Sequence, residues 1–140
     1  MIVPFLPAHL KELVVHEYIN YIQNEMAEET YGAALAEGEA YSYISDGDVI
    51  GCAGILAVSK NKYQVWALLS EKSGKHMTQI TKMALKTLNN YKGSRLETHV
   101  RCDFKVGIKW VNMLKFINET PDGMKKWGDD GYDYYLYSWV

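Results

Sequence analysis

Residues 63–90, YQVWALLSEKSGKHMTQITKMALKTLNN, decide the fold. Residues 63–69 are aromatic, β-branched or otherwise apolar except for one glutamine, which predicts a strand. The apolar period then changes. Four apolar residues within 74–90 share one face of a predicted helix, namely Met77, Ile80, Ala84 and Leu88. Three lysines lie largely off that face. A strand followed at once by an amphipathic helix predicts the first half of a β-α-β unit.

Two further strands are predicted on the N-terminal side of this stretch. Residues 40–45 alternate and reach Asp46-Gly47, a strong hairpin signal, after which residues 48–58 return as a strand. Asn61-Lys62 makes the next turn, so residues 40–69 predict an antiparallel meander of three strands. Residues 2–6 contain Pro4 and predict an edge strand or none. Residues 8–36 have helical spacing and, with two glycines, favour two helices.

On the C-terminal side, Gly93 ends the helix and residues 95–102 alternate as a fourth long strand. Residues 106–117 predict a second amphipathic helix with four candidate core positions, Ile108, Val111, Met113 and Leu114. Residues 132–140 predict a closing strand. A strand–helix–strand crossover implies a parallel pair within an otherwise antiparallel sheet. The predicted fold class is mixed α/β, a mostly antiparallel sheet with one parallel strand pair and flanking helices, in a single domain over residues 1–140.

The composition is that of an ordinary globular chain. Among 140 residues, 23% are charged and 48% hydrophobic, and 15 Lys and Arg against 17 Asp and Glu give a net charge of −2. That balance argues against bulk attraction to nucleic acid or anionic lipid. No apolar run approaches 18 residues and MIVPFLPAH lacks a signal-peptide pattern, so we expect no membrane insertion. Cys52 and Cys102 belong to no metal-binding motif and are expected to be inert.

The order of strands and helices, with a glycine-bearing loop opening the helix after the third long strand, resembles the GNAT acyltransferase superfamily. The resemblance covers almost the whole chain and is strongest over residues 39–116. Within that superfamily the chain is most similar to the small internal virion proteins of short-tailed bacteriophages. Four features carry this likeness: the Gln64-Val65-Trp66 strand, the 70–91 loop and helix, the 100–116 strand and helix, and the Tyr-rich end. It implies a location in the virion or in the cytoplasm of an infected host cell.

The resemblance implies acetyl-CoA as cofactor. GNAT enzymes pair a central strand with the pantetheine arm, which would here be Trp66, Ala67, Leu68 and Leu69. The family's Arg/Gln-x-x-Gly-x-Gly/Ala loop offers backbone amides to the pyrophosphate. The residues that would do so here are Lys72, Ser73, Gly74, Lys75 and His76. Ser73 replaces the Arg, His76 a Gly and Thr78 a Gly or Ala, so the resemblance implies a degraded phosphate site.

The catalytic pattern also departs from the family. Phe116 matches the family's Gly-Phe helix end, but Lys115 replaces the glycine and Val111 falls where the family has a Tyr general acid. A valine cannot donate a proton. The substitute candidates are Glu97 and His99 on the fourth strand, with Asp103 just after it, and Tyr63 on the third.

The sequence leaves two functions open. In the first, the protein retains the fold but has lost the chemistry, and acts as a virion or host-interaction component through its surface. In the second, it moves an acetyl group from acetyl-CoA to a primary amine. The lysines around residues 105–126 favour a solvated face over a nucleic-acid site, since no nucleic-acid-binding motif accompanies them. The aromatic C-terminal strand predicts protein partners or self-association if one of its faces is uncovered.

Overall fold

The computed structural model describes residues 1–14 and 29–140. They form two compact units, the first made of residues 1–57 and 65–80 and the second of residues 58–64 and 81–140. Strand β4 (Lys62–Leu69) and helix α4 (Met77–Asn89) contribute residues to both units. None of the helices in the described part of the chain is long and apolar enough to cross a membrane.

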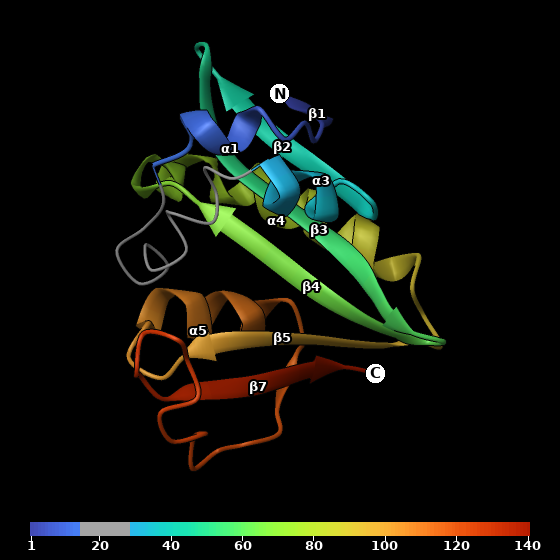
Figure 1. The fold of residues 1–140 in the computed structure, drawn as a ribbon, viewed down its shortest axis with the longest axis vertical. Coiled ribbons are helices and arrows are strands. Elements are labelled where there is room, and N and C mark those ends of the chain that lie inside the picture. Colours follow the sequence, from blue (N-terminus) through green and yellow to red (C-terminus); the bar gives the residue numbers. More distant parts are fainter. Residues whose placement is uncertain (15–28) are drawn as a thin grey trace. The chain divides into compact units, whose positions relative to one another are not determined.

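Seven strands form one sheet in the order β1-β2-β3-β4-β5-β7-β6 (Figure 1). Besides β4, they are β1 (Ile2–Pro4), β2 (Glu39–Ser45), β3 (Asp48–Ser59), β5 (Arg95–Arg101), β6 (Ile117–Asn118) and β7 (Tyr134–Trp139). Strands β4 and β5 are parallel, with Lys62 opposite Arg95 and Gln64 opposite Glu97. The pairs β1–β2, β2–β3, β5–β7 and β6–β7 are antiparallel. The predicted mixed α/β fold class is therefore confirmed.

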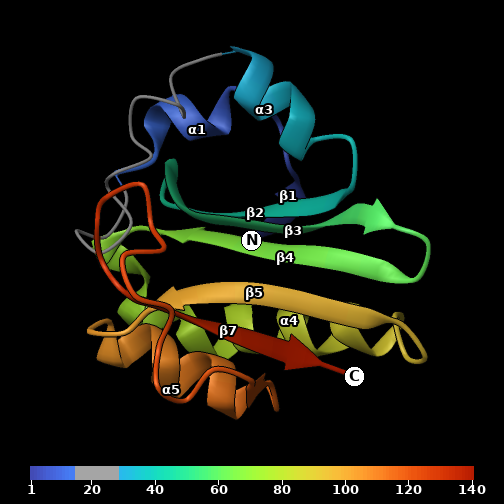
Figure 2. The same cartoon turned by 60° about the horizontal axis from the view of Figure 1, so that its bottom comes forward.

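In the first unit, helices α1 (His9–Glu12) and α3 (Glu29–Leu35) cover one face of β2 and β3 (Figure 2). Their core joins apolar side chains from both layers, namely Phe5, Leu10, Leu13, Leu35, Val49, Cys52 and Leu68. The predicted Asp46-Gly47 hairpin turn is present, and both residues have the positive φ (52° and 81°) of a type I′ turn. Residues 15–28 of the helical stretch predicted over residues 8–36 lie outside the described residues.

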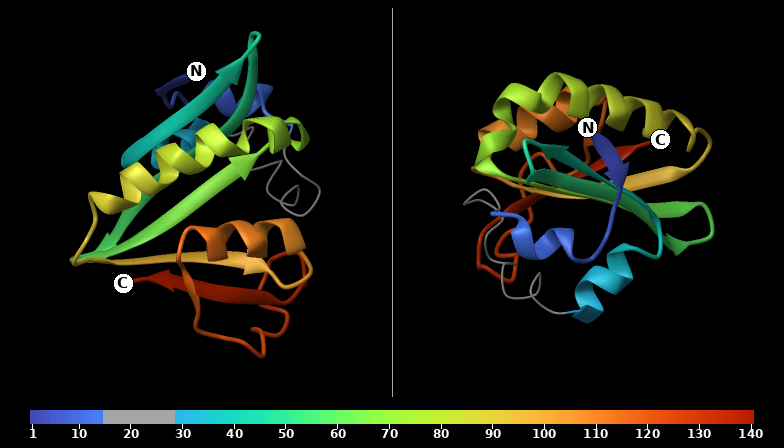
Figure 3. Two further views of the ribbon diagram at one scale, coloured as in Figure 1. Left: turned by 180° about the vertical axis from the view of Figure 1, so that it is seen from behind. Right: turned by 90° about the horizontal axis from the view of Figure 1, so that it is seen from above.

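In the second unit, residues 81–89 of α4 and helix α5 (Lys105–Met113) lie on the same face of β5 and β7 (Figures 2 and 3). The indole Nε1 of Trp110 donates to Thr81 Oγ1 at 2.9 Å and joins the two helices. The buried apolar side chains of this unit include Leu88, Leu96, Val100, Val111, Leu114 and Phe116.

The end of α5 differs from the prediction. The helix ends at Met113, Met113 is 54% exposed rather than part of the core, and Ile117 belongs to β6. The reason is a Schellman motif, in which the N–H of Lys115 donates to Asn112 O at 3.1 Å and the N–H of Phe116 to Val111 O at 3.0 Å. These bonds satisfy the last carbonyls and turn the chain out of the helix.

Candidate functional site

The loop that the sequence assigned to a pyrophosphate is wound into a 3₁₀ helix over Glu71–His76. Ser70 is its N-cap, and the Ser70 Oγ accepts the Lys72 N–H at 2.9 Å while the Ser70 carbonyl accepts the Ser73 N–H at 3.0 Å. The Met77 N–H at the start of α4 donates to Gly74 O. A 3₁₀ helix pairs amides with carbonyls three residues earlier. Two of the amides that would hold an anion, those of Lys72 and Ser73, are thus hydrogen-bonded within the chain.

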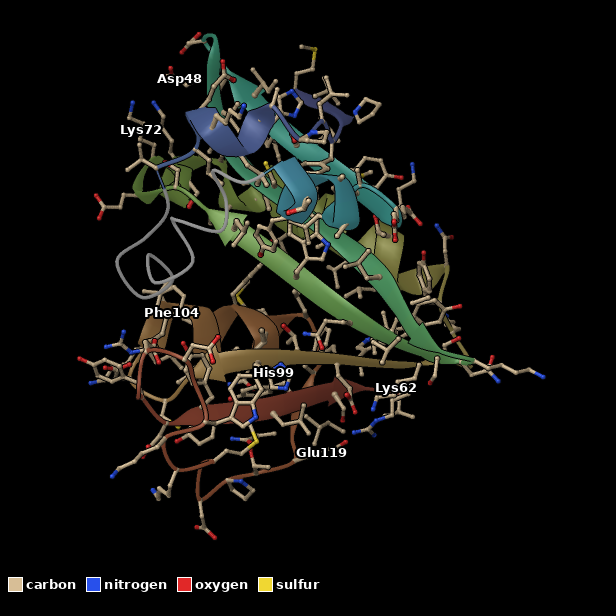
Figure 4. The ribbon with its side chains drawn as sticks, in the orientation of Figure 1. Asp48, Lys62, Lys72, His99, Phe104 and Glu119 are labelled. Atoms are coloured by element: carbon tan, nitrogen blue, oxygen red, sulfur yellow. The ribbon has the colours of Figure 1, made fainter. Side chains whose placement is uncertain are left out.

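The charges around this loop are mixed. Glu71 places a carboxylate in the first helical turn, where it competes with an anion for the positive end of the helix. The Lys72 ammonium lies 3.5 Å from the carboxylate of Asp48, and both side chains are exposed (Figure 4). Gly74 has no neighbour within 4 Å of the position that a Cβ would occupy, and its φ is not positive. Nothing in residues 1–14 and 29–140 therefore requires a glycine there, and no described residue crowds that side of the loop.

His76 is held by a neighbouring strand. Its imidazole lies 5.0 Å from the ring of Tyr43 on β2, and the Tyr43 hydroxyl donates to Gln79 Oε1. Tyr43 is 7% exposed, so this contact belongs to a packed part of the first unit. The His76 side chain therefore packs against a buried ring. The resemblance aligns His76 with a glycine, so its Cβ lies where the family pattern has no side chain.

The side chains of the predicted pantetheine strand are largely occupied by packing. Leu68 is 5% exposed in the core of the first unit, and Trp66 meets Phe5 edge-on with ring centroids 5.4 Å apart. The Trp66 indole N–H is buried without a hydrogen-bond partner in the described part of the chain. If this strand meets a cofactor, it does so through its backbone, as the resemblance implies.

The four candidate catalytic residues do not converge, and the carboxylate of Asp103 is paired with Arg101. Glu97 and His99 share one face of β5, because they are two residues apart in a strand. Gln64 of β4 lies opposite Glu97, and its Nε2 is 3.5 Å from His99 Nδ1. Tyr63 lies opposite Leu96 and thus on the other face, with its ring 5.0 Å from that of Tyr91.

Glu97 belongs to a network of ion pairs. Its carboxylate lies 2.7 Å from Arg95 Nε and 3.4 Å from Lys62 Nζ, and Arg95 also binds Glu119 at 2.6 Å. The Ser138 hydroxyl donates to Glu119. Burial disfavours the charged form of Glu97, but the Arg95 hydrogen bond and the two cations outweigh it and lower its pKa. A carboxylate held in this way is a weaker base than an isolated one.

His99 has the environment of a neutral imidazole. Its ring stacks on the indole of Trp127, with centroids 4.2 Å apart and planes 18° from parallel. Burial lowers the pKa of His99, and the charge of Glu97 opposes that shift only in part. The neutral ring can accept a proton at pH 7, but its lowered pKa makes it a weaker base than a free imidazole. Trp127, which is 48% exposed, and Gln64 were not predicted as site residues, because their contact with His99 depends on loop geometry and strand register.

On α5, Lys115 and Val111 are the positions that the sequence resemblance aligned with the family's glycine and tyrosine. Lys115 has a φ of 72°, the left-handed conformation that favours the glycine of the family pattern. In the same register the family's tyrosine falls on Val111, which is 7% exposed and fills the core. An open hollow of about 510 Å³ runs along the outer side of α5 and is lined by Lys105, Ile108, Lys109, Asn112 and Met113.

The cysteines offer no nucleophile. Cys52 is 1% exposed and burial raises the pKa of its thiol to about 11. Burial also raises the pKa of Cys102. Both are therefore protonated at neutral pH, as expected for inert thiols. Among residues 1–14 and 29–140, no group of three or more His, Cys, Asp or Glu side chains is placed to hold a metal ion.

Acetyl-CoA, the cofactor that the fold implies, does not fit the loop as it stands. A pyrophosphate needs unpaired amides and a close approach to the backbone. Here Ser70 and the 3₁₀ winding use the amides, Glu71 adds a negative charge, and His76 adds a Cβ. The hollow along α5 does offer two cationic side chains, Lys105 and Lys109, and one amide, Asn112.

The chain is similar in structure to N-acetyltransferases along its whole length. Ard1 of Thermoplasma volcanium superposes with a TM-score of 0.76 and 14% identity, over 100% of this chain and 96% of that chain. The ribosomal-protein-alanine N-acetyltransferase of Brucella melitensis superposes with a TM-score of 0.77 and 10% identity, over 100% of this chain and 99% of that chain. An acetyltransferase of the GNAT family from Bacillus anthracis superposes with a TM-score of 0.68 and 11% identity, over 99% of this chain and 93% of that chain.

Structure comparison finds proteins similar to this chain, whereas sequence comparison finds none. No family model matches the chain, and no curated protein matches it. At 10–14% identity the structural likeness speaks for the fold alone. The chain has the fold of the GNAT N-acetyltransferases.

Proposed function

We propose that the chain is a GNAT-fold protein of the phage type, a virion-associated or host-interaction component whose acetyltransferase site is degenerate. The observation that carries this proposal is the closed loop at residues 70–77. In it the Ser70 hydroxyl occupies the Lys72 amide, and the following 3₁₀ turn leads into α4 through the bond from Met77 N–H to Gly74 O. A helix start that is capped by its own side chain has little left to offer an anion.

The catalytic positions support the same proposal. Val111 is buried at the place of the family's acid, Glu97 is engaged with Arg95 and Lys62, and Tyr63 lies on the opposite strand face. Acetyl transfer needs a base for the amine and an acid for the leaving thiolate. His99 remains as a single candidate base, without a partner acid.

The surface would then carry the function, in the virion or in the cytoplasm of the infected cell. The aromatic strand β7 is the predicted region of self-association or partner binding. Tyr137 is 2% exposed, and Trp139 is half-buried. Replacing both with Ala therefore tests core stability together with association, and the protein's sedimentation should be measured at a temperature where the variant is folded.

An active N-acetyltransferase is the second candidate, and the neutral His99 stacked on Trp127 favours it. GNAT acetyltransferases generally use acetyl-CoA. In this alternative Lys105 and Lys109 would hold the phosphates of acetyl-CoA, which would supply the acetyl group as a thioester whose C–S bond breaks to release CoA as the thiolate, and His99 would accept the proton that the primary amine loses. The acceptor is a protein amino group in this reading, by analogy with the Brucella melitensis enzyme, which acts on an alanine of a ribosomal protein.

Calorimetric titration with acetyl-CoA separates the two candidates. A degenerate site predicts no heat of binding at millimolar acetyl-CoA and an unchanged melting temperature. Micromolar binding with a rise in melting temperature would overturn it, since a ligand that binds only the folded state stabilises that state. In that case an acceptor screen should follow, with His99→Gln as the test variant and His9→Gln, at a histidine of α1, as the matched control.

A further inference from the structure

Charge is distributed unevenly between the two units. The second unit has twelve Lys and Arg against seven Asp and Glu, a formal charge of +5, whereas the first has three against ten, a formal charge of −7. The net charge of −2, which argued against a polyanionic partner, is thus the sum of two regional charges of opposite sign, +5 and −7. A local field, rather than the total charge, decides what a surface attracts.

The positive charge of the second unit is concentrated on its helices. Neither α4 nor α5 contains an Asp or Glu. Six lysines on these helices and their flanks are exposed: Lys82, Lys86, Lys92, Lys105, Lys109 and Lys115. We name these six residues the lysine face. In the described part of the chain, the ion pairs of this unit involve other cations, namely Lys62, Arg95, Arg101 and Lys125.

The acidic residues of the same unit do not neutralise the lysine face. Five of the seven already pair with a cation elsewhere, and they are Glu97, Asp103, Glu119, Asp130 and Asp133. The other two, Asp122 and Asp129, lie in the segment between β6 and β7. The lysine face therefore keeps its charge.

A solvated helix face is a poor explanation for this pattern. Lys82 and Lys86 are one helical turn apart, as are Lys105 and Lys109, and like charges at this spacing destabilise a helix by roughly 0.2–0.5 kcal/mol per pair. Ordinary surfaces mix the two signs. Two neighbouring helices lie on one side of the sheet (Figure 3), and both lack the compensating acids. The Trp110 indole joins them by donating to Thr81. No ion pair among the described residues of the unit compensates the repulsion between these lysines.

We infer that the lysine face binds the phosphate backbone of double-stranded nucleic acid. Exposed amide side chains lie among the lysines, Asn89 and Asn90 at the end of α4 and Asn112 on α5, and such groups also donate to phosphate oxygens. Lys105, Lys109 and Asn112 border the same open stretch of α5, so two ammonium groups and one amide lie on one side of this helix. Binding of this kind is independent of base sequence.

Two other polyanions fit less well. A membrane surface needs a continuous apolar face with aromatic anchors, whereas the large exposed apolar residues on these helices are isolated, Leu85 on α4 and Val106 and Met113 on α5. Single-stranded nucleic acid is held by stacking on exposed aromatic rings. The only aromatic residue of α5 is Trp110, which is half-buried and bonded to Thr81, and α4 has none. A duplex needs neither feature.

Binding to a labelled DNA duplex of mixed sequence tests the inference. Fluorescence anisotropy should show an affinity that falls steeply between about 50 and 200 mM salt, with a log–log slope near −4 if about four phosphates are neutralised. The double variant Lys86→Glu/Lys109→Glu should lose about tenfold or more in affinity at the lower salt concentration. The double variant Lys11→Glu/Lys60→Glu changes the net charge equally at exposed positions outside the lysine face and should bind as the unmodified protein does.

Four outcomes would overturn the inference. Absence of duplex binding at low salt would do so directly, and equal losses in both variants would reduce the effect to total charge. Tighter binding to vesicles of anionic lipid than to the duplex would assign the face to a membrane. A change of sedimentation in the Lys86→Glu/Lys109→Glu variant with unchanged DNA binding would assign the face to a second copy of the chain, whose first unit is acidic. None of these readouts depends on whether acetyl-CoA binds.

Discussion

His76 and Lys115 both stand where the GNAT pattern has glycine, and the two replacements meet different local structures. At Lys115 the backbone keeps the left-handed conformation (φ 72°) and the complete Schellman motif, although the side chain is unsuited to it. At His76 the backbone is part of a 3₁₀ helix, and the imidazole packs on Tyr43. The turn after α5 thus has the geometry that favours glycine, whereas the loop at residues 70–76 is held by hydrogen bonds of its own.

The difference has a physical basis. The turn after α5 is fixed by backbone bonds and by burial of Val111 and Phe116, so a lysine there costs some strain and changes little else. The phosphate loop of a GNAT enzyme depends on amides left unpaired for a ligand. Once a serine in the N-cap position can accept one of them, the ligand-free loop gains stability by closing.

The largest effect is expected when the support of His76 is removed. Tyr43→Ala should lower the free energy of unfolding by about 3 kcal/mol or more, because the ring is 7% exposed and a large cavity would remain. Denaturant unfolding measures this. Tyr43→Phe is the matched control and should cost about 1 kcal/mol, since only the hydrogen bond to Gln79 is lost. Equal losses in the two variants would show that the ring contributes little to this packing.

Opening the cap of the phosphate loop should have the next largest effect. Ser70→Ala removes the acceptor of the Lys72 N–H and should cost about 1 kcal/mol, as for other N-cap serines. Ser59→Ala, at an exposed position near the end of β3, should change stability by a few tenths at most. If Ser70→Ala were neutral, the loop would not be held by its own cap, and the comparison with Lys115 would lose one of its two sides.

The turn after α5 provides a prediction of opposite sign. Lys115→Gly should raise the free energy of unfolding by about 1 kcal/mol, because glycine adopts a positive φ without steric strain. Lys109→Gly, in the interior of α5, should lower it by about the same amount. A loss of stability in both variants would mean that the lysine side chain contributes more at position 115 than its backbone strain costs.

Much of the fold could be predicted because its signals are local. The change of apolar period around residues 63–90, the Asp46-Gly47 turn and the strand–helix–strand order led to the sheet with its parallel pair. The end of α5 could not be predicted, because neither Gly nor Pro marks it in the sequence and lysine, the residue at position 115, rarely takes a positive φ. Strand β6 has two residues and is too short to leave a periodic pattern.

The candidate site was less predictable for a different reason. Whether Tyr63 shares a face with Glu97 and His99 depends on the register of the parallel strands, which the sequence does not specify. The ion pairs of Glu97 join residues that are far apart in the chain, Lys62 and Arg95 among them. The cap at Ser70 had a recognisable signal, a serine between a strand and a helix, but the helix was expected to begin only at residue 74.

The smallest effect is expected from restoring glycine in the phosphate loop, and it distinguishes the Cβ from the ring. His76→Gly and His76→Ala both lose the contact with Tyr43, but only glycine also removes the Cβ that stands in the way of a phosphate. Binding of CoA, measured by calorimetry, should therefore strengthen in the glycine variant relative to the alanine variant. The gain should be small, because the Ser70 hydroxyl still holds the Lys72 amide, and it should grow when Ser70→Ala is added. Identical CoA binding in all these variants would mean that the cofactor, if it binds at all, does not use residues 70–76. The closed loop would then no longer support the proposal of a degenerate site.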